Sequence, residues 1–407
     1  MRVLLRNFRS WWQLPRNIME RPEHRQITFL ELFYDLIYVV IIAELTHSLA
    51  IHVDLDHLLQ FIFLFIIVWW TWLNGTFYYE LHGNDDIRTR VFTFAKMFCV
   101  MSMAVFANDA TGSTSVGFAI SLGAFQLILM YMWWRTGVHD PDHRPISVPY
   151  AYAFLSVTTL FFTSIVVEPP FRLYLWAAAT LIAILMPLLV FVLGRNNPIA
   201  QQHLEIGSRA SHSLVERFGL FTLIVMGEVI VGVVQGIAEH EKLTWEVGAI
   251  AALSMLIAFG IWWLYFDTVS HRLPRQRIWS AIWMYTHLPV TAGIAMIGAA
   301  NLNIVEHAGE MLPEAVRWLL VVAIIIVLLG IALLIQAVQP HEHFERAYRN
   351  TQRAMVSISV IIILLGFTTI ETIPLIACVV ALLFIPIIVG LVNWSQISEM
   401  RSREVAI

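Results

Sequence analysis

Long apolar runs separated by short polar connections fill the chain from about residue 28 to residue 394. A helix needs about 20 mostly apolar residues to cross the hydrocarbon core of a bilayer. An open sheet would leave backbone groups unpaired in lipid, so we expect an all-α polytopic membrane protein. The pattern predicts twelve membrane-spanning helices, at residues 28–51, 57–79, 90–110, 116–135, 148–167, 172–194, 213–237, 245–266, 278–300, 315–338, 353–371 and 374–394.

The composition supports this class. Hydrophobic residues make up 58% of the 407 residues and charged residues 13%, whereas soluble domains carry about 25% charged residues. This balance excludes a soluble enzyme and a disordered scaffold. No long basic run or nucleic-acid-binding module is present, so we expect no nucleic-acid partner. Cys99 and Cys378 lie inside apolar runs and are expected to pack as small hydrophobic residues.

The first 27 residues carry six arginines and no apolar core, so they do not resemble a cleavable signal peptide. Trp11 and Trp12 among these arginines indicate a segment that lies on the membrane surface. A solvated basic tail is the alternative interpretation.

The distribution of Lys and Arg predicts the orientation, because short cytoplasmic loops are enriched in these residues. With twelve spans, 21 of the 25 Lys and Arg residues fall on the side of the two termini. Arg172, Lys242 and Arg317 fall on the other side, and Lys96 lies within a span. Both termini, including the tail at 395–407, are therefore expected to be cytoplasmic.

The two halves of the chain resemble each other. The segment VWWTWLN at 68–74 aligns with IWWLYFD at 261–267 at an offset of 193 residues. Two glutamates, spaced 13 residues apart in the first half and 12 in the second, lie on the opening span of each half. These similarities predict two parallel six-helix repeats, at 28–194 and 213–394, joined by a cytoplasmic linker at 195–212.

Ten ionisable side chains lie within the predicted spans or at their ends. At the centre of a membrane helix a charge costs about 2.5–3.5 kcal/mol, so such residues are expected to face the interior of the bundle. We expect them to contribute to a substrate or ion pathway. They are Glu31, Asp35, Glu44, His47, Lys96, Glu216, Arg217, Glu228, Asp267 and His287.

Helix geometry limits which of these residues can meet. Asp35 and Lys96 lie at similar depths in the first and third spans, which predicts a buried ion pair with Glu31 on its cytoplasmic side. Either this cluster or its counterpart can be purely structural, because buried pairs and interhelical hydrogen bonds stabilise membrane bundles. The counterpart in the second half consists of Glu216, Arg217 and His287.

Glu44 and Glu228 lie about 18–20 Å further along their helices, past the bilayer midplane. Neither has a Lys or Arg within its own span at that depth. Desolvation favours the protonated form of such an acid, which suits a proton or cation relay. His47, one turn from Glu44, can share that proton or act as an interfacial histidine.

Aromatic residues next to these acids permit a cation site. The ring faces of Trp69, Trp70, Trp72, Trp262, Trp263 and Tyr265 can line such a site, or the rings can simply pack. Two polar loops, at 139–143 and 341–343, contain His with Asp or Glu, as zinc sites do, but both are expected to be solvated. Neither loop has a defined metal-binding spacing, and no soluble-type catalytic motif is present, so we expect no metal or cofactor.

Several of these segments are similar to those of a known family. ELFYDLIYVV at 31–40 and ERFGLFTLIVMGE at 216–228 resemble two segments of the bacterial low-temperature-requirement A (LtrA) family. WWTW at 69–72, WWLYFD at 262–267 and YTHLP at 285–289 fit further family patterns. The resemblance extends from about residue 25 to about 394. It departs from the family where Tyr34 and Tyr38 replace phenylalanine, a conservative change.

The resemblance implies a polytopic bacterial membrane protein linked by name to growth in the cold, and it supplies no biochemical activity. The residues favour a transporter or channel for a proton, cation or small polar solute, located in the bacterial inner membrane among membrane lipids. An intramembrane enzyme acting on lipid, which would use the cytoplasmic-side cluster, is the alternative. A non-catalytic membrane factor in cold or stress adaptation is a third possibility, and a homo-oligomer is compatible with each.

Overall fold

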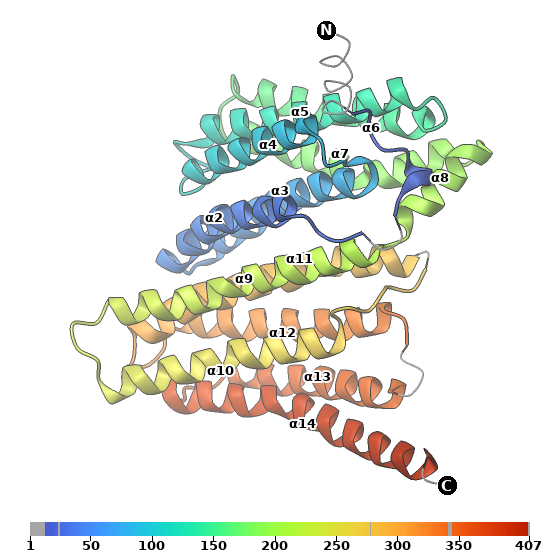
Figure 1. Cartoon of the computed structure of the whole chain (residues 1–407). Coiled ribbons are helices and arrows are strands. Elements are labelled where there is room, and N and C mark those ends of the chain that lie inside the picture. The colour runs from blue at the N-terminus through green and yellow to red at the C-terminus, as the bar shows by residue number, and fades with distance from the viewer. Residues whose placement is uncertain (1–12, 23–24, 277, 341–343, 406–407) are drawn as a thin grey trace. The chain divides into compact units, whose positions relative to one another are not determined.

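The protein is described by a computed structural model that covers residues 13–22, 25–276, 278–340 and 344–405. Within these residues the chain forms thirteen α-helices, one short 3-10 helix and no named strand, which confirms the all-α prediction. The helices divide between two compact units (Figure 1).

Unit 1 comprises Met1–Leu45 and Ile62–Leu214, and unit 2 comprises Thr46–Phe61 and Val215–Ile407. The end of α2 and the start of α3, residues 46–61, thus belong to unit 2, although both lie in the first predicted repeat. The two six-helix repeats stay a prediction. The elements of unit 1 are η1 (Ile18–Glu20), most of α2 (Phe29–Ile51) and of α3 (Leu55–His82), α4 (Ile87–Val105), α5 (Ser115–His139), α6 (Arg144–Ser164), α7 (Phe171–Gly194) and α8 (Pro198–Ser208).

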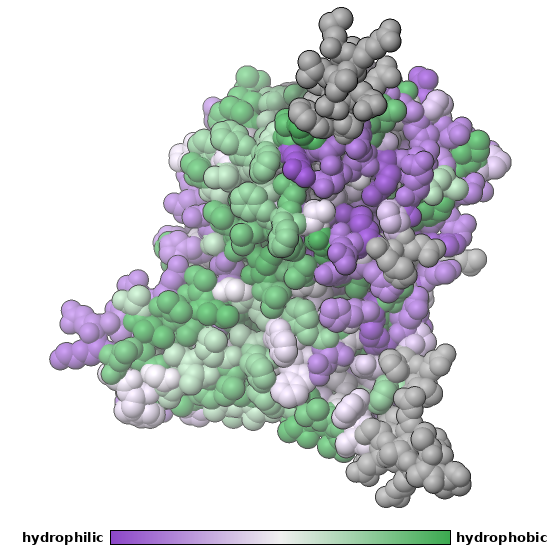
Figure 2. Space-filling model, in the orientation of Figure 1, coloured by the Kyte–Doolittle hydropathy of each residue, from purple (hydrophilic) through white to green (hydrophobic). Residues whose placement is uncertain are grey.

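In unit 1, α5 packs against both α4 and α6, and α6 packs against α7. Exposed leucines and phenylalanines line the outward face of α7, as expected of a lipid-facing helix. In Figure 2, hydrophobic residues cover the middle of the unit 1 helices and hydrophilic residues gather around α8.

Unit 2 contains most of α9 (His212–Ala238), followed by α10 (Trp245–Thr268), α11 (Ile278–Glu306), α12 (Glu314–Ala337), α13 (Glu345–Leu365) and α14 (Thr372–Val405). Here α12 packs between α11 and α13, and α14 packs on both α13 and α10 (Figure 1). The apolar stretch of α11 is 78% buried and that of α14 is 33% buried. Thus α11 is an interior helix, and α14 presents a broad apolar face to its surroundings.

Among the described residues, nine helices are long and apolar enough to cross a membrane: α3, α5, α6, α7, α9, α10, α11, α12 and the Thr372–Ser395 part of α14. The predicted spans at 28–51, 90–110 and 353–371 correspond to α2, α4 and α13, which are helical but are not among these nine. Helices α4 and α13 are less apolar because they carry several charged residues, and α2 is apolar apart from Glu31, Asp35 and Glu44. That these three also cross the membrane stays a prediction.

The predicted linker contains a helix that the hydrophobic pattern did not indicate. Asn197 caps α8, because its side-chain oxygen accepts hydrogen bonds from the backbone N–H groups of Ile199 and Ala200 at 3.0 and 3.2 Å. Pro198 occupies the first helical position, where a backbone N–H group would have no acceptor within the helix, so proline is tolerated there. The helix is too short to span and contacts η1, α6 and α7.

Candidate functional site

A polar cluster lies inside unit 1 between α2, α3 and α4. The fully buried Asp35 accepts a hydrogen bond from Trp72 Nε1 at 2.8 Å. The hydroxyls of Tyr34 and Tyr38 are 3.0 Å apart, and the buried Lys96 Nζ lies 5.0 Å from the centroid of the Tyr34 ring. The expected residues Asp35 and Lys96 thus belong to one aromatic environment, and their direct ion pair stays a prediction.

A separate ionic network connects α2 and α3 to the N-terminal segment. Arg25 donates two hydrogen bonds, each of 2.8 Å, to the two carboxylate oxygens of Glu31. The same guanidinium donates to Glu80 at 2.6 Å, and Arg21 donates to Glu80 at 3.0 Å. Glu31 and Glu80 are 2% and 1% exposed. Because both carboxylates are neutralised, the network is an anchor for the chain before α2.

This network bears on the prediction for residues 1–27. Arg21 and Arg25 bind buried carboxylates, and Arg16 donates to the backbone carbonyl of Leu81 at 3.4 Å, so the described part of the segment is held against unit 1 and is not a solvated tail. Trp11 and Trp12 lie outside the described residues, and a position on the membrane surface stays a prediction. Burial opposes the charge of Arg25, but its hydrogen bonds and ion pairs with Glu31 and Glu80 outweigh this effect and raise the pKa of Arg25. Ser211 and Ser213 also donate to Glu80, at 2.6 and 3.0 Å. Glu80 was missed because it directly follows the predicted span 57–79.

In unit 2 the buried His287 lies between α9 and α10. Its Nδ1 donates to the Trp283 carbonyl at 2.7 Å, so Nε2 is left to accept a 2.9 Å hydrogen bond from the Tyr265 hydroxyl. The rings of Phe218 and Trp283 pack against it, with centroids 4.8 and 4.7 Å away, and against each other, with centroids 4.7 Å apart. Both ring nitrogens of His287 therefore have hydrogen-bond partners inside unit 2.

Of its expected partners, Arg217 is 1% exposed and Glu216 is exposed. Neighbouring residues of a helix point about 100° apart, and here Arg217 points into unit 2 and Glu216 points out of it. The expectation that every ionisable residue faces the bundle interior also fails for His47 and Asp267, which are exposed, whereas Glu44 is half-buried. No described hydrogen bond joins His47 to Glu44.

Glu228 of α9 is 4% exposed. Within the described chain, no side chain donates a hydrogen bond to its carboxylate or pairs with it. The α9 and α11 backbones approach closely here: a Cβ added to Gly298 would lie 2.7 Å from the Glu228 carbonyl oxygen, and one added to Gly232 would collide with the Gly298 carbonyl. Small residues permit such close packing of membrane helices. Glu228 is thus a buried acid beside a tight helix contact.

Three histidines form a buried group in unit 1 that the sequence did not indicate. His143 Nδ1 lies 3.1 Å from His203 Nδ1, and the His82 and His143 rings pack edge to face with centroids 4.8 Å apart. All three are at most 3% exposed, so the prediction that the 139–143 loop is solvated is wrong for His143. No described group of three His, Cys, Asp or Glu residues is arranged to hold a metal ion. The second predicted loop, 341–343, lies outside the described residues.

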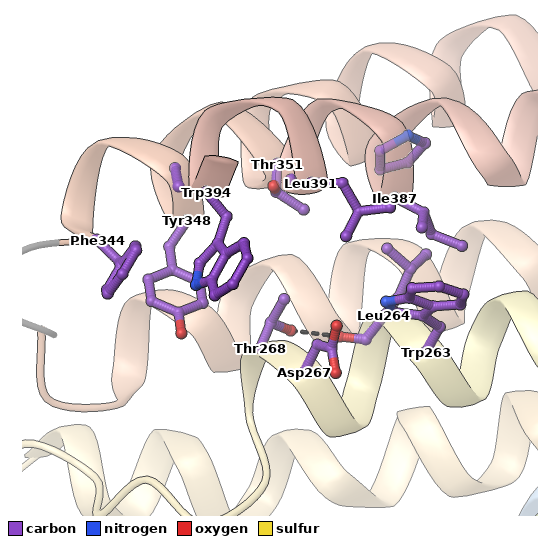
Figure 3. A pocket seen from close by; sticks show the side chains of 13 residues that line it. Trp263, Leu264, Asp267, Thr268, Phe344, Tyr348, Thr351, Ile387, Leu391 and Trp394 are labelled. Carbon is purple, nitrogen blue, oxygen red and sulfur yellow. Dashed lines mark hydrogen bonds between the residues drawn. The ribbon is translucent and has the colours of Figure 1, made fainter. Parts of the chain in front are cut away.

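A cavity of about 390 Å³ lies between α10, α13 and α14 of unit 2 (Figure 3). Its polar groups include the carboxylate of Asp267 and the hydroxyl of Thr351. Aromatic rings form much of the remaining wall. They belong to Trp263, Phe344, Tyr348 and Trp394. The cavity therefore joins one of the predicted site residues to aromatic side chains from three helices.

Comparison with known proteins identifies a family and a relative that each match most of the chain. The sequence model of the family described as "Bacterial low temperature requirement A protein (LtrA)" matches residues 26–393. A protein of Rhizobium meliloti (strain 1021) named "Uncharacterized protein RA0937" is 25% identical over an alignment of 291 residues, and the match covers 68% of this chain and 68% of the relative.

Proposed function

The chain belongs to the bacterial low temperature requirement A family, and from that premise we propose that it moves a proton or a small cation across the bacterial inner membrane. The family match supports a multi-pass membrane protein. The proposal adds an activity, in which acidic groups inside apolar helices exchange the proton or cation along a path through the bilayer.

The observation that carries the proposal is Glu228. This carboxyl group is 4% exposed and has no described hydrogen-bonding or ionic partner. A structural carboxylate in an apolar helix would be expected to have such a partner, as Glu31 and Glu80 do. A buried acid without a partner lowers the stability of the folded protein. The presence of Glu228 at this position therefore favours a role in which it binds a proton or cation transiently.

The half-buried Glu44 supplies the corresponding acid on α2, and it too has no described partner. Glu31 is removed from the proposed path because Arg25 holds both of its carboxylate oxygens. Asp35, Lys96 and His287 remain candidates for lining the path.

The alternative of a lipid enzyme has less support. Its expected acid and base residues were Glu31, Asp35, Lys96, Glu216 and His287. None of them lines the described cavity at the end of α10, whose wall holds the single carboxylate of Asp267. General acid–base chemistry requires a positioned partner for such a group. A non-catalytic factor in cold adaptation is favoured by the family name alone.

Flux measurements on the purified full chain in liposomes test the proposal. We expect wild-type protein to conduct protons or a monovalent cation. The flux through Glu228→Gln should be lower by a factor of about ten or more, because glutamine cannot titrate. Glu314→Gln, which changes an exposed acid at the start of α12, serves as the matched control and should keep the flux. Equal melting temperatures would show that Glu228→Gln is folded. Undiminished flux in Glu228→Gln, or no flux in wild type with any monovalent ion, would overturn the proposal.

A further inference from the structure

The cavity between α10, α13 and α14 has the chemistry of a site for an organic cation. We propose that it binds the ammonium group of a small alkylammonium compound, with Asp267 as the counter-charge and Trp263 and Trp394 as aromatic walls. The site does not depend on the proposed transport, because its residues are separate from Glu228 and Glu44.

The aromatic walls of the cavity favour a cationic ligand. Ring faces attract a cation within about 6 Å of their centroids, and tryptophan does so most strongly. In Figure 3, Trp394 and Tyr348 lie on one side of Asp267 and Trp263 lies on the other. The guanidinium carbon of Arg272 already lies 4.3 Å from the centroid of the Tyr348 ring. The wall therefore holds one cation of the protein itself, and the two tryptophans remain for a ligand.

Asp267 supplies the counter-charge. It is exposed to the cavity, and no described residue forms an ion pair or hydrogen bond with its carboxylate. It also lies in the last turn of α10, which ends at Thr268. The carbonyl end of a helix carries partial negative charge, so a carboxylate there is unfavourable until a cation binds. A bound ammonium group would satisfy both the side chain and the helix end.

The lining also indicates which cations fit. A divalent metal ion needs several oxygen ligands, and a single carboxylate among aromatic and aliphatic groups does not provide them. Alkylammonium groups carry their charge on an apolar surface, which matches rings and side chains such as Leu264, Ile387 and Leu391. The volume of about 390 Å³ lies in the range of small-molecule sites, about 300–1,000 Å³.

Two sources can supply this group: the headgroup of an amine-bearing phospholipid, or a soluble ammonium compound. Leu391 and Trp394 of α14 line the cavity and are 44% and 55% exposed, so the cavity is continuous with the apolar outer face of this helix. Trp394 lies at the end of the apolar part of α14, Thr372–Ser395, and tryptophan at such a position is typical of the headgroup level of a membrane. Both sources share the same recognition chemistry, and separate experiments distinguish them.

The first experiment titrates the full chain, in a maltoside detergent, with tetramethylammonium chloride against sodium chloride at equal ionic strength. Ligand binding to the folded state raises the melting temperature in a concentration-dependent way. We expect wild type to respond, and Asp267→Asn, Trp263→Leu and Trp394→Leu each to weaken the apparent affinity about tenfold. Glu314→Gln and Trp245→Leu, which change an exposed acid and an exposed tryptophan outside the cavity, should respond as wild type does.

The second experiment identifies the source. The protein is placed in nanodiscs that contain phosphatidylglycerol and phosphatidylethanolamine. Native mass spectrometry then measures the mass of the protein released from the nanodiscs with the lipids that stay bound to it. If wild type retains one more phosphatidylethanolamine than Asp267→Asn does, and tetramethylammonium displaces it, the ligand is a headgroup. If tetramethylammonium binds without this difference, the ligand is a soluble ammonium compound. If wild type and Asp267→Asn behave alike toward both probes, the proposed site is wrong. Trp394 lies on the exposed part of α14, so Trp394→Leu provides a folded variant should Asp267→Asn be unstable.

Discussion

His143 is a titratable side chain that folding removes from water. It lies between α5 and α6 and is 1% exposed. Burial, followed by the neighbouring His82 and His203, lowers its pKa to about 2. In the unfolded chain the pKa stays near 6.5. The unfolded state therefore binds more protons below that pH, and stability must fall as the pH falls below about 6.5.

We predict that the protein loses about 2 kcal/mol of stability between pH 7 and pH 5 through this one residue. His143→Phe removes the titration and should flatten the dependence of melting temperature on pH over this window. His139→Phe is the matched control, because His139 is exposed and precedes the same loop. A pH dependence that persists unchanged in His143→Phe would contradict the assignment.

Single residues are where the sequence was least informative. The ionisable residues within apolar runs were recognisable, because their type conflicts with their surroundings. Their partners were not: Glu80 binds Arg21 and Arg25, 59 and 55 residues earlier in the chain, and Ser211, 131 residues later. Helical spacing predicts neighbours one turn away, and tertiary contacts of this separation have no local signal. Which side of a helix is exposed depends likewise on the neighbouring helices. Glu216 was expected to face the interior and is exposed.

At the scale of elements, the contact between α9 and α11 depends on glycine. A Cβ at Gly232 would collide with the Gly298 backbone, which cannot move aside as a flexible side chain can. We predict that Gly232→Ala separates the two helices and costs about 1–3 kcal/mol. Gly227→Ala lies on the same helix but meets open space, so it should raise stability by about 0.5–1 kcal/mol. Thermal unfolding of both variants checks the sign, and equal effects would contradict the close contact.

The helices themselves were predictable from the apolar runs, because a bilayer requires a long stretch of one composition. Two features escaped this signal. The short helix α8 is set by the Asn197 cap and Pro198. Helix α13 begins at Glu345, before the predicted start at 353, because its first turns are amphipathic, with Ala347 and Thr351 buried beside exposed arginines. Hydropathy alone does not detect either pattern.

At the scale of the whole molecule, the number of crossings decides where the C-terminus lies. After α8 the chain contains α9, α10, α11, α12 and α14, which qualify as spans, and α13, which is less apolar. If α13 crosses, six crossings return the C-terminus to the side of α8. If it does not, the two lie on opposite sides. Its exposed arginines lie in its first turns, where long side chains can reach the headgroups, so we expect it to cross.

We therefore predict that Gln202 of α8 and the C-terminus are both cytoplasmic and that Lys242, between α9 and α10, is external. Gln202 and Lys242 are exposed, so each can be changed to cysteine and labelled. The exposed Cys378 is first replaced by alanine, whereas Cys99 is buried and stays. In intact cells a membrane-impermeant reagent should label Lys242→Cys and not Gln202→Cys, and a reporter fused after Ile407 should be active inside. If the reporter is external while Gln202→Cys stays unlabelled, α13 does not cross the membrane. Labelling at Gln202 with protection at Lys242 would reverse the orientation that the arginine distribution predicts.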